Sequence, residues 1–182
     1  MNTLWIRPAK PTDGARLAEI HRPYVTDTAI TFQTVPTDGA GFAEKVGHMG
    51  NYPFLVAEVE GKVLGFCYGS PLRPHEAYRW EVELTVYVDQ TARQQGVGSA
   101  LYTALLEALT RQGYHAAYGC ITQPNEPSMA LHRRMGFTEV GRFPASGFKL
   151  GAWHDVAWMH KVLKEGAPGE VRPVAEVLEE IL

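Results

Sequence analysis

The chain has 182 residues, of which 45% are hydrophobic and 20% charged, and its formal net charge is −3 at pH 7. This length and composition are typical of one globular domain, and the slight acidity disfavours a nucleic-acid partner. No run of 18 apolar residues and no charged-then-apolar leader occurs, so neither a membrane span nor a signal peptide is expected. The two cysteines, Cys67 and Cys120, lie in apolar, strand-like surroundings, which favours reduced thiols and a cytoplasmic protein.

The first half of the chain alternates strand-like apolar runs with helical periodicity. The spacing predicts, in chain order, a strand at residues 4–7, a helix from about Thr12 to Tyr24, a short helix from Phe42 to Met49, and a hairpin of strands at 54–59 and 63–68. After a polar loop at residues 71–77, residues 81–88 alternate, so that Glu81, Glu83 and Thr85 share one strand face. That face is therefore not simply core.

The segment after this strand has the features of a phosphate-binding loop. Its residues are Arg93, Gln94, Gln95, Gly96, Val97, Gly98 and Ser99, and a helix is expected over residues 100–112. The first N–H groups of a helix have no internal partner and carry partial positive charge, and Gly96 and Gly98 allow a pyrophosphate to approach the backbone. The spacing matches neither the Gly-x-Gly-x-x-Gly dinucleotide fingerprint nor the P-loop, which needs Lys followed by Ser or Thr.

The second half predicts the remaining elements of an α/β fold. Strands are expected at residues 114–122, 138–142 and 156–163, with a helix after Pro127 that ends near Gly136. Strands interspersed with helices predict an α/β layered domain around one mixed sheet, over residues 1–163. Residues 164–182 read as a linker and a short amphipathic helix beginning at Pro173, which is either a frayed terminus or a helix docked on the same subunit or a partner.

Several motifs together carry a family resemblance over about residues 4–163. They are residues 31–36, 77–80, Glu83 with 86–88, 93–99, 125–128, Leu131 with His132, 147–149 and 153–155. This set resembles the GNAT superfamily of N-acetyltransferases, and within it the phosphinothricin and methionine sulfone/sulfoximine acetyltransferases. The resemblance implies a GNAT-type mixed, centrally splayed β-sheet flanked by helices. It also implies acetyl-CoA as co-substrate, no metal, and a homodimer with the site near its two-fold interface.

The resemblance implies three groups of residues that hold acetyl-CoA. The glycine-bearing loop, residues 93–99, would bind the pyrophosphate, and the pantetheine arm would run back along Val86, Tyr87 and Val88 as an added strand does. Asn125 would contact this arm through its side chain, with Ser128 as a weaker candidate. Asn125 also precedes a helix, so its side chain can act as an N-cap, and the two roles are compatible.

Glu83 is the predicted general base, because the resembling enzymes place a catalytic glutamate three residues before the Val-x-Val motif. From the residue pattern alone, a solvent-facing strand residue is the more frequent interpretation of Glu83, and only the resemblance reverses this preference. Glu81, on the same face, is its competitor as general base. His132 is the second catalytic candidate, to orient substrate or to help move a proton. Oxyanion stabilisation is expected from a backbone N–H near Thr85. No cysteine stands in a nucleophile context, which favours direct transfer within a ternary complex.

The substrate is expected to contact the loop at residues 71–80 and the segment around Phe32. The candidates are Phe32, Arg73, His75, Tyr78, Trp80 and Thr85. An Arg can bind a carboxylate through two parallel hydrogen bonds, which favours a small amino-acid-like substrate. Related sequences often carry a second Arg where this chain has His75, so a doubly anionic substrate such as phosphinothricin should bind less tightly. Two alternatives stay open, a non-catalytic CoA-binding sensor module and an acetyltransferase for another amine or a protein.

Overall fold

The computed structural model describes residues 3–182, which build one seven-stranded sheet in the order β1-β2-β3-β4-β5-β7-β6. The strands are β1 (Trp5–Pro8), β2 (Phe54–Val59), β3 (Lys62–Pro71), β4 (Glu81–Val88), β5 (Ala116–Thr122), β6 (Thr138–Lys149) and β7 (Ala152–Val162). The helices are α1 (Gly14–Thr26), α2 (Gly39–Gly47), α3 (Val97–Gln112), α4 (Glu126–Arg134) and α5 (Val174–Ile181). Every neighbouring pair is antiparallel except β4 and β5, so the sheet is mixed.

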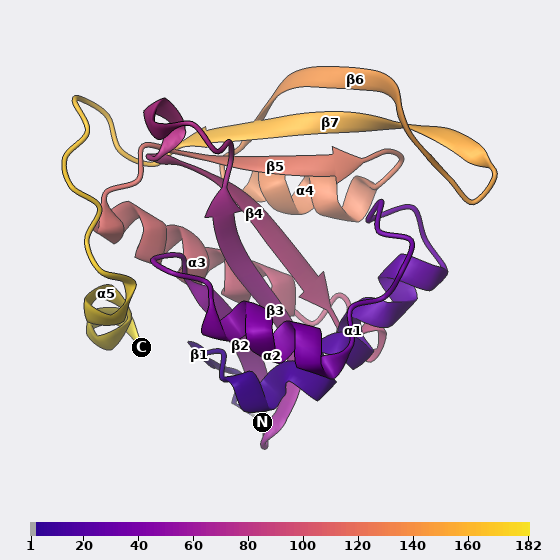
Figure 1. Ribbon diagram of the computed structural model, residues 1–182, viewed down its shortest axis with the longest axis horizontal. Coiled ribbons are helices and arrows are strands. Elements are labelled where there is room, and N and C mark those ends of the chain that lie inside the picture. The colour runs from indigo at the N-terminus through magenta and orange to yellow at the C-terminus, as the bar shows by residue number, and fades with distance from the viewer. Residues whose placement is uncertain (1–2) are drawn as a thin grey trace.

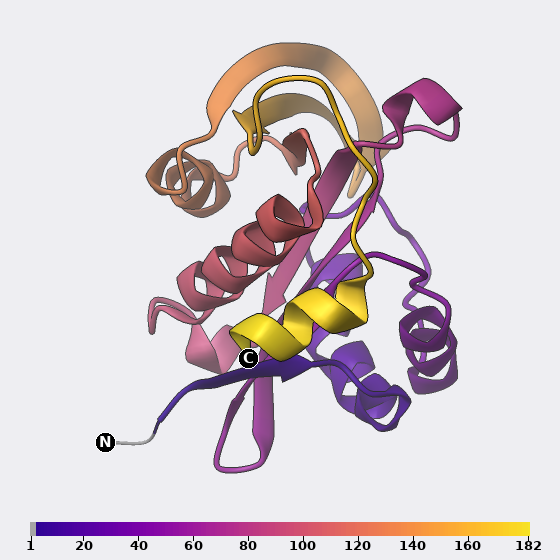
Figure 2. The ribbon, with the colours of Figure 1, turned by 90° about the vertical axis from the view of Figure 1, so that its left-hand side faces the viewer.

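Helices cover both faces of the sheet, α3 and α4 on one face and α1 and α2 on the other (Figures 1 and 2). On the first face Leu101, Leu105 and Leu109 of α3 are fully buried, and on the second Leu17 packs with Phe66. Burying each leucine stabilises the fold by about 1.5–3 kcal/mol. Among the described residues, no helix combines the length and apolar character that crossing a membrane requires.

The ladder between β4 and β5 stops halfway. These parallel strands pair only from Glu81 with Ala116 to Glu83 with Tyr118. Beyond that point β4 continues to Val88 and β5 to Thr122, and the strands diverge (Figure 1). Facing backbone groups are thereby left free for a ligand. The mixed, centrally splayed sheet flanked by helices is confirmed.

The β6–β7 hairpin is longer than the sequence predicted. Strands were expected at 138–142 and 156–163, whereas β6 reaches Lys149, and Leu150 and Gly151 make the turn with φ of +52° and +79°. Pro144 and Gly147 read as turn signals, but the pairing register shifts between Phe143 and Gly147, so an irregular strand accommodates them. Near the N-terminus, α1 begins at Gly14 rather than Thr12, because Pro11–Asp13 form a 3-10 turn.

The C-terminal helix α5 packs against α3. Val177 is fully buried. Asn51 holds the start of the helix, since its Oδ1 accepts from the Val174 N–H at 2.6 Å and its Nδ2 donates to the Arg172 carbonyl at 2.9 Å. The Gln112 side chain donates to the same carbonyl at 3.1 Å. In this structure the tail therefore covers its own subunit.

Candidate active site

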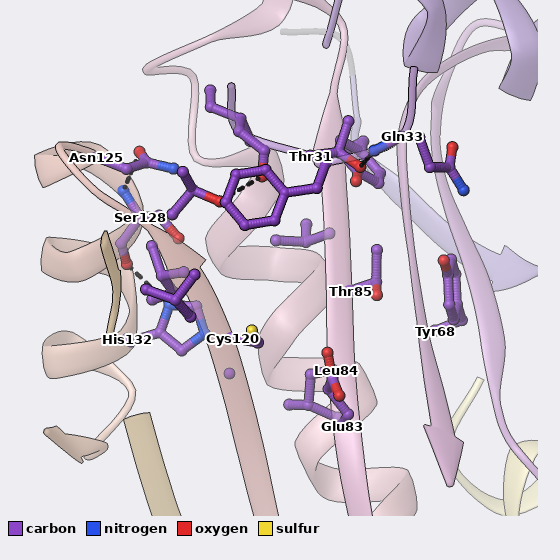
Figure 3. A pocket seen from close by; sticks show the side chains of 18 of the residues that line it. Thr31, Gln33, Tyr68, Glu83, Leu84, Thr85, Cys120, Asn125, Ser128 and His132 are labelled. Carbon is purple, nitrogen blue, oxygen red and sulfur yellow. Dashed lines mark hydrogen bonds between the residues drawn. The ribbon is translucent and has the colours of Figure 1, made fainter. Parts of the chain in front are cut away.

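A cavity of about 270 Å³ occupies the opening between β4 and β5 (Figure 3). Its walls come from both faces of the sheet. They include the loop at residues 30–33, Tyr68, residues 83–87 of β4, Tyr102 of α3, residues 119–122 of β5, Asn125, Ser128 and His132 around α4, and Val156 of β7. In Figure 3 the α4 side chains lie across the opening from Glu83 and Thr85. A ligand in the opening would thus contact groups from β4, β5 and α4 together.

The start of α3 lies beyond the carboxyl end of β4. Gly96 is its N-cap residue with φ of +80°, a left-handed conformation that only glycine adopts without strain. No side chain caps this end, so its first N–H groups remain available to an anion. At Gly98 an added Cβ would meet Leu131 and Val88 only at 3.6–3.7 Å, so the protein alone does not require glycine there. The Arg93 guanidinium lies 5.3 Å from the centre of the Tyr24 ring.

Asn125 and Ser128 line the cavity at the start of α4. The Asn125 Oδ1 accepts from the Ser128 N–H at 3.3 Å, so the N-cap role that the sequence allowed is present. On the opposite wall Val86 and Tyr87 line the cavity, and Val88 lies one residue further along β4. These residues pair with β3 on one edge, while their other edge is the one that β5 leaves open.

Glu83 and Thr85 lie on β4 where the strands separate, and both line the cavity. Burial raises the pKa of Glu83, and the nearby Arg73 guanidinium partly opposes this shift. Glu81 shares the same strand face but lies within the paired section, and it does not line the cavity. Of the two carboxylates, Glu83 is therefore the one that lines the opening.

His132 is buried against β5, with its ring over Gly119. A Cβ at Gly119 would lie 2.3 Å from the His132 Nε2, so only glycine leaves room for the ring. The Nδ1–H donates to the Ser128 carbonyl at 2.8 Å, and Nε2 therefore accepts from the Tyr102 hydroxyl at 3.0 Å. Burial lowers the pKa of His132, so the imidazole is neutral near pH 7.

Tyr102 is a cavity residue that the sequence did not indicate. It is 1% exposed and belongs to α3, where it reads as one more apolar helix residue. Burial raises its pKa far above the ordinary value, so the hydroxyl keeps its proton. Its partner His132 lies 30 residues away, and no local pattern links the two.

The loop before β4 holds four predicted substrate residues, and none of them lines the cavity. Arg73 lies over the Trp158 ring at 5.9 Å, close enough to Glu83 to affect its pKa. The Trp80 indole N–H instead donates to the Gly169 carbonyl of the tail at 2.7 Å. His75 and Tyr78 are exposed on this loop. Phe32 and Thr85, by contrast, contribute to the cavity wall.

The fold and this cavity define a class of α/β protein whose mixed sheet opens between two parallel strands, with a carboxylate, a histidine and a tyrosine lining the opening. Within residues 3–182, no cluster of three or more His, Cys, Asp or Glu could hold a metal ion.

Comparison with known proteins agrees with this description. The Acetyltransferase (GNAT) domain family matches residues 6–158. A phosphinothricin N-acetyltransferase of Streptomyces viridochromogenes is 38% identical over 94% of this chain and 95% of its own length. An L-methionine sulfoximine/L-methionine sulfone acetyltransferase of Pseudomonas paraeruginosa is 35% identical over 85% of this chain and 91% of its own length. The crystal structure of a Sinorhizobium meliloti phosphinothricin acetyltransferase in complex with acetyl-CoA superposes with a TM-score of 0.89 at 35% identity, covering 94% and 97% of the two chains.

The chain therefore belongs to the GNAT acetyltransferase family, and the family resemblance inferred from its motifs is confirmed. It is an N-acetyltransferase by this relationship, similar to enzymes named for phosphinothricin and for methionine sulfoximine and sulfone.

Proposed function

We propose that this protein moves the acetyl group of acetyl-CoA directly to the α-amino group of a small amino-acid analogue. The acceptor would be of the phosphinothricin, methionine sulfoximine or methionine sulfone type, as the names of its relatives suggest. The single observation that carries the proposal is the position of Glu83, a partly buried carboxylate at the point where β4 and β5 separate.

The chain's own residues fit acetyl-CoA along one continuous path. The uncapped start of α3 would hold the pyrophosphate on the N–H groups of Val97, Gly98 and Ser99. The open edge of β4 at residues 86–88 would pair with the pantetheine amides, and Asn125 would contact them from α4. Acetyl-CoA supplies an acyl group activated as a thioester.

Proton transfer is assigned to Glu83. It accepts a proton from the substrate ammonium, and the resulting amine bonds to the acetyl carbon as the C–S bond breaks. The new amide nitrogen gives up its second proton, and the leaving thiolate takes it up to depart as the free thiol. A backbone N–H near Thr85 and Val86 would stabilise the negative charge that develops on the carbonyl oxygen. The raised pKa of Glu83 makes it a stronger base than an exposed glutamate.

His132 is assigned to positioning. Both of its ring nitrogens are already hydrogen-bonded, to Ser128 and to Tyr102, and its lowered pKa keeps the ring uncharged. The ring therefore holds the Tyr102 hydroxyl, and both side chains line the cavity.

The test is thiol release from acetyl-CoA with a panel of methionine sulfone, methionine sulfoximine, phosphinothricin, ordinary L-amino acids and a lysine peptide. Glu83→Gln should lower kcat/KM by roughly 10²–10⁴-fold, since an amide cannot accept the proton. Glu81→Gln is the matched variant on the same strand face and should change kcat/KM little. Equal losses in both variants would contradict the assignment of Glu83.

The panel also separates the alternatives. Tight acetyl-CoA binding without turnover on any amine would favour the sensor module, and turnover on the lysine peptide alone would favour a protein substrate. The family resemblance predicts that an Arg often stands at the position of His75, and on that prediction we expect phosphinothricin to rank below methionine sulfone.

We further infer a homodimer and a cytoplasmic location. Phe148, Leu150 and Trp153 are 61%, 62% and 64% exposed at the end of the β6–β7 hairpin, which suits a contact with a second copy. Cys67 and Cys120 are both free thiols, as is usual in a reducing compartment.

A further inference from the structure

We propose that Gly147 and Lys149, at the end of β6, are positioning residues for the loop at residues 30–33. This loop forms the acceptor side of the cavity, where the amine would bind, and its position would set the affinity for the amine. The inference rests on the proposed acetyl transfer. It also gives a role to two motifs that acetyl-CoA binding leaves unused, residues 147–149 and 153–155.

The Phe32 ring packs directly against Gly147, in the space that a side chain there would fill. A Cβ at position 147 would lie 2.3 Å from both Cε2 and Cζ of Phe32, far inside contact distance. No left-handed φ is found at Gly147, so the ring rather than the backbone requires glycine there. Since Phe32 is part of the cavity wall, the shape of that wall depends on a residue that lies outside it.

Lys149 makes a second contact with the loop at residues 30–33 that contains Phe32. Its residue is 7% exposed, and its Nζ donates to the Thr31 carbonyl at 2.7 Å. A buried ammonium is costly unless its hydrogens are bonded, so this contact strongly restrains Thr31. The Lys149 carbonyl in turn accepts from the His154 Nε2 at 3.0 Å, and the His154 ring lies 6.4 Å from Phe32.

These contacts act on one side of the cavity only. The loop at residues 30–33 lies between α1 and α2, on the face opposite α3 and α4 (Figure 1). The proposed cofactor contacts come from α3, from the start of α4 and from the backbone of β4, and none of them is a side chain of this loop. A displaced Thr31 or Phe32 should therefore change amine binding and leave acetyl-CoA binding intact.

The decisive variant is Gly147→Ala, with Gly141→Ala as its matched control. Both glycines lie on β6 with ordinary φ, but a Cβ at Gly141 meets nothing within 4 Å. Gly147→Ala should raise KM for the amine on the order of 10–100-fold at unchanged KM for acetyl-CoA. Gly141→Ala should match the wild type in both constants.

A double variant tests the mechanism of this effect. In a Phe32→Ala background the ring is gone, so Gly147→Ala should add no further change in amine KM. Lys149→Met should also raise amine KM selectively, and Lys149→Arg, which keeps a cation, should recover part of the loss. These readouts separate positioning from general destabilisation, which would reduce both affinities or only the unfolding temperature.

The outcomes are distinct. If the wild type turns over an amine and Gly147→Ala behaves as Gly141→Ala does, the positioning role is wrong and the proposed reaction stands. If the wild type neither turns over nor binds any amine by calorimetry while it binds acetyl-CoA, the proposed reaction is wrong and the positioning role falls with it.

Discussion

Burial shifts the pKa of ionisable side chains in and beside the cavity. Desolvation raises the pKa of Glu83 and lowers the pKa of His132 and of Lys149, so each shift favours the neutral form. For Glu83 the consequence is a better base, and for His132 it is a fixed, uncharged hydrogen-bond partner of Tyr102. In the proposed mechanism these two catalytic candidates therefore have different roles, Glu83 as the base and His132 as a positioning residue.

His21, a buried residue of α1, makes the stability of the fold depend on pH. It is 3% exposed, its ring meets Phe42 and Tyr87 edge-on, and its Nδ1 has no hydrogen-bond partner among residues 3–182. Desolvation, with the nearby charges of Lys45 and Lys149, lowers its pKa from 6.5 to about 4. The unfolded chain therefore protonates this ring at a higher pH than the folded chain. The contribution of His21 to stability is full above pH 6.5 and falls as the pH drops toward 4.

We expect His21→Phe to remove this part of the acid sensitivity. Between pH 7 and pH 4.5 the wild type should lose about 2–3 kcal/mol of unfolding free energy through His21, and the variant should not. Urea unfolding at the two pH values measures the difference. The exposed His48 provides the control, since His48→Phe should keep the wild-type dependence. An equal loss in wild type and His21→Phe would contradict the argument.

At the scale of elements, the docking of α5 makes a prediction about local stability. Val177→Asp places a carboxylate in the apolar contact with α3, where an unpaired charge is strongly disfavoured. Amide protons of residues 174–181 should be protected from hydrogen exchange in the wild type and exposed in this variant, with α3 still protected. Ala175→Asp changes an exposed residue of the same helix and should retain protection. Absence of protection in the wild type would show that α5 is not docked in solution.

The order of strands and helices could be predicted because each carries its own apolar period. The start of α3 at Gly96 could also be predicted, because the strand, the glycine and the helix follow one another closely in the chain. The full length of β6 was not, because Pro144 and Gly147 have the composition of a turn and only pairing with β7 keeps them in a strand. The hydrogen bond from Trp80 to the tail and the one between Tyr102 and His132 both join segments that lie far apart in the sequence. Such contacts leave no periodic signal.

At the scale of the whole molecule, helices cover some parts of the sheet and leave others exposed. Around β2 and β3 helices pack on both faces, whereas the β6–β7 hairpin extends past the helices (Figure 1). The hairpin also carries exposed aromatic side chains. Phe148 and Trp153 face each other across the hairpin with ring centres 5.4 Å apart. The same hairpin contacts the loop at residues 30–33 through Gly147 and Lys149, so a second copy bound at its end would lie close to that loop.

We therefore expect the wild type to sediment as a dimer at micromolar concentration and the double variant Leu150→Lys with Trp153→Glu to sediment as a monomer. New charges at a buried contact would lack partners, and this cost disfavours association. Trp5→Glu is the matched control, because Trp5 is 65% exposed but lies on β1 at the opposite edge of the sheet. It should remain a dimer. A monomeric wild type, or equal dissociation by Trp5→Glu, would contradict an interface at the hairpin. If the interface also stabilises the loop at residues 30–33, the monomeric variant should show a raised KM for the amine at an unchanged KM for acetyl-CoA.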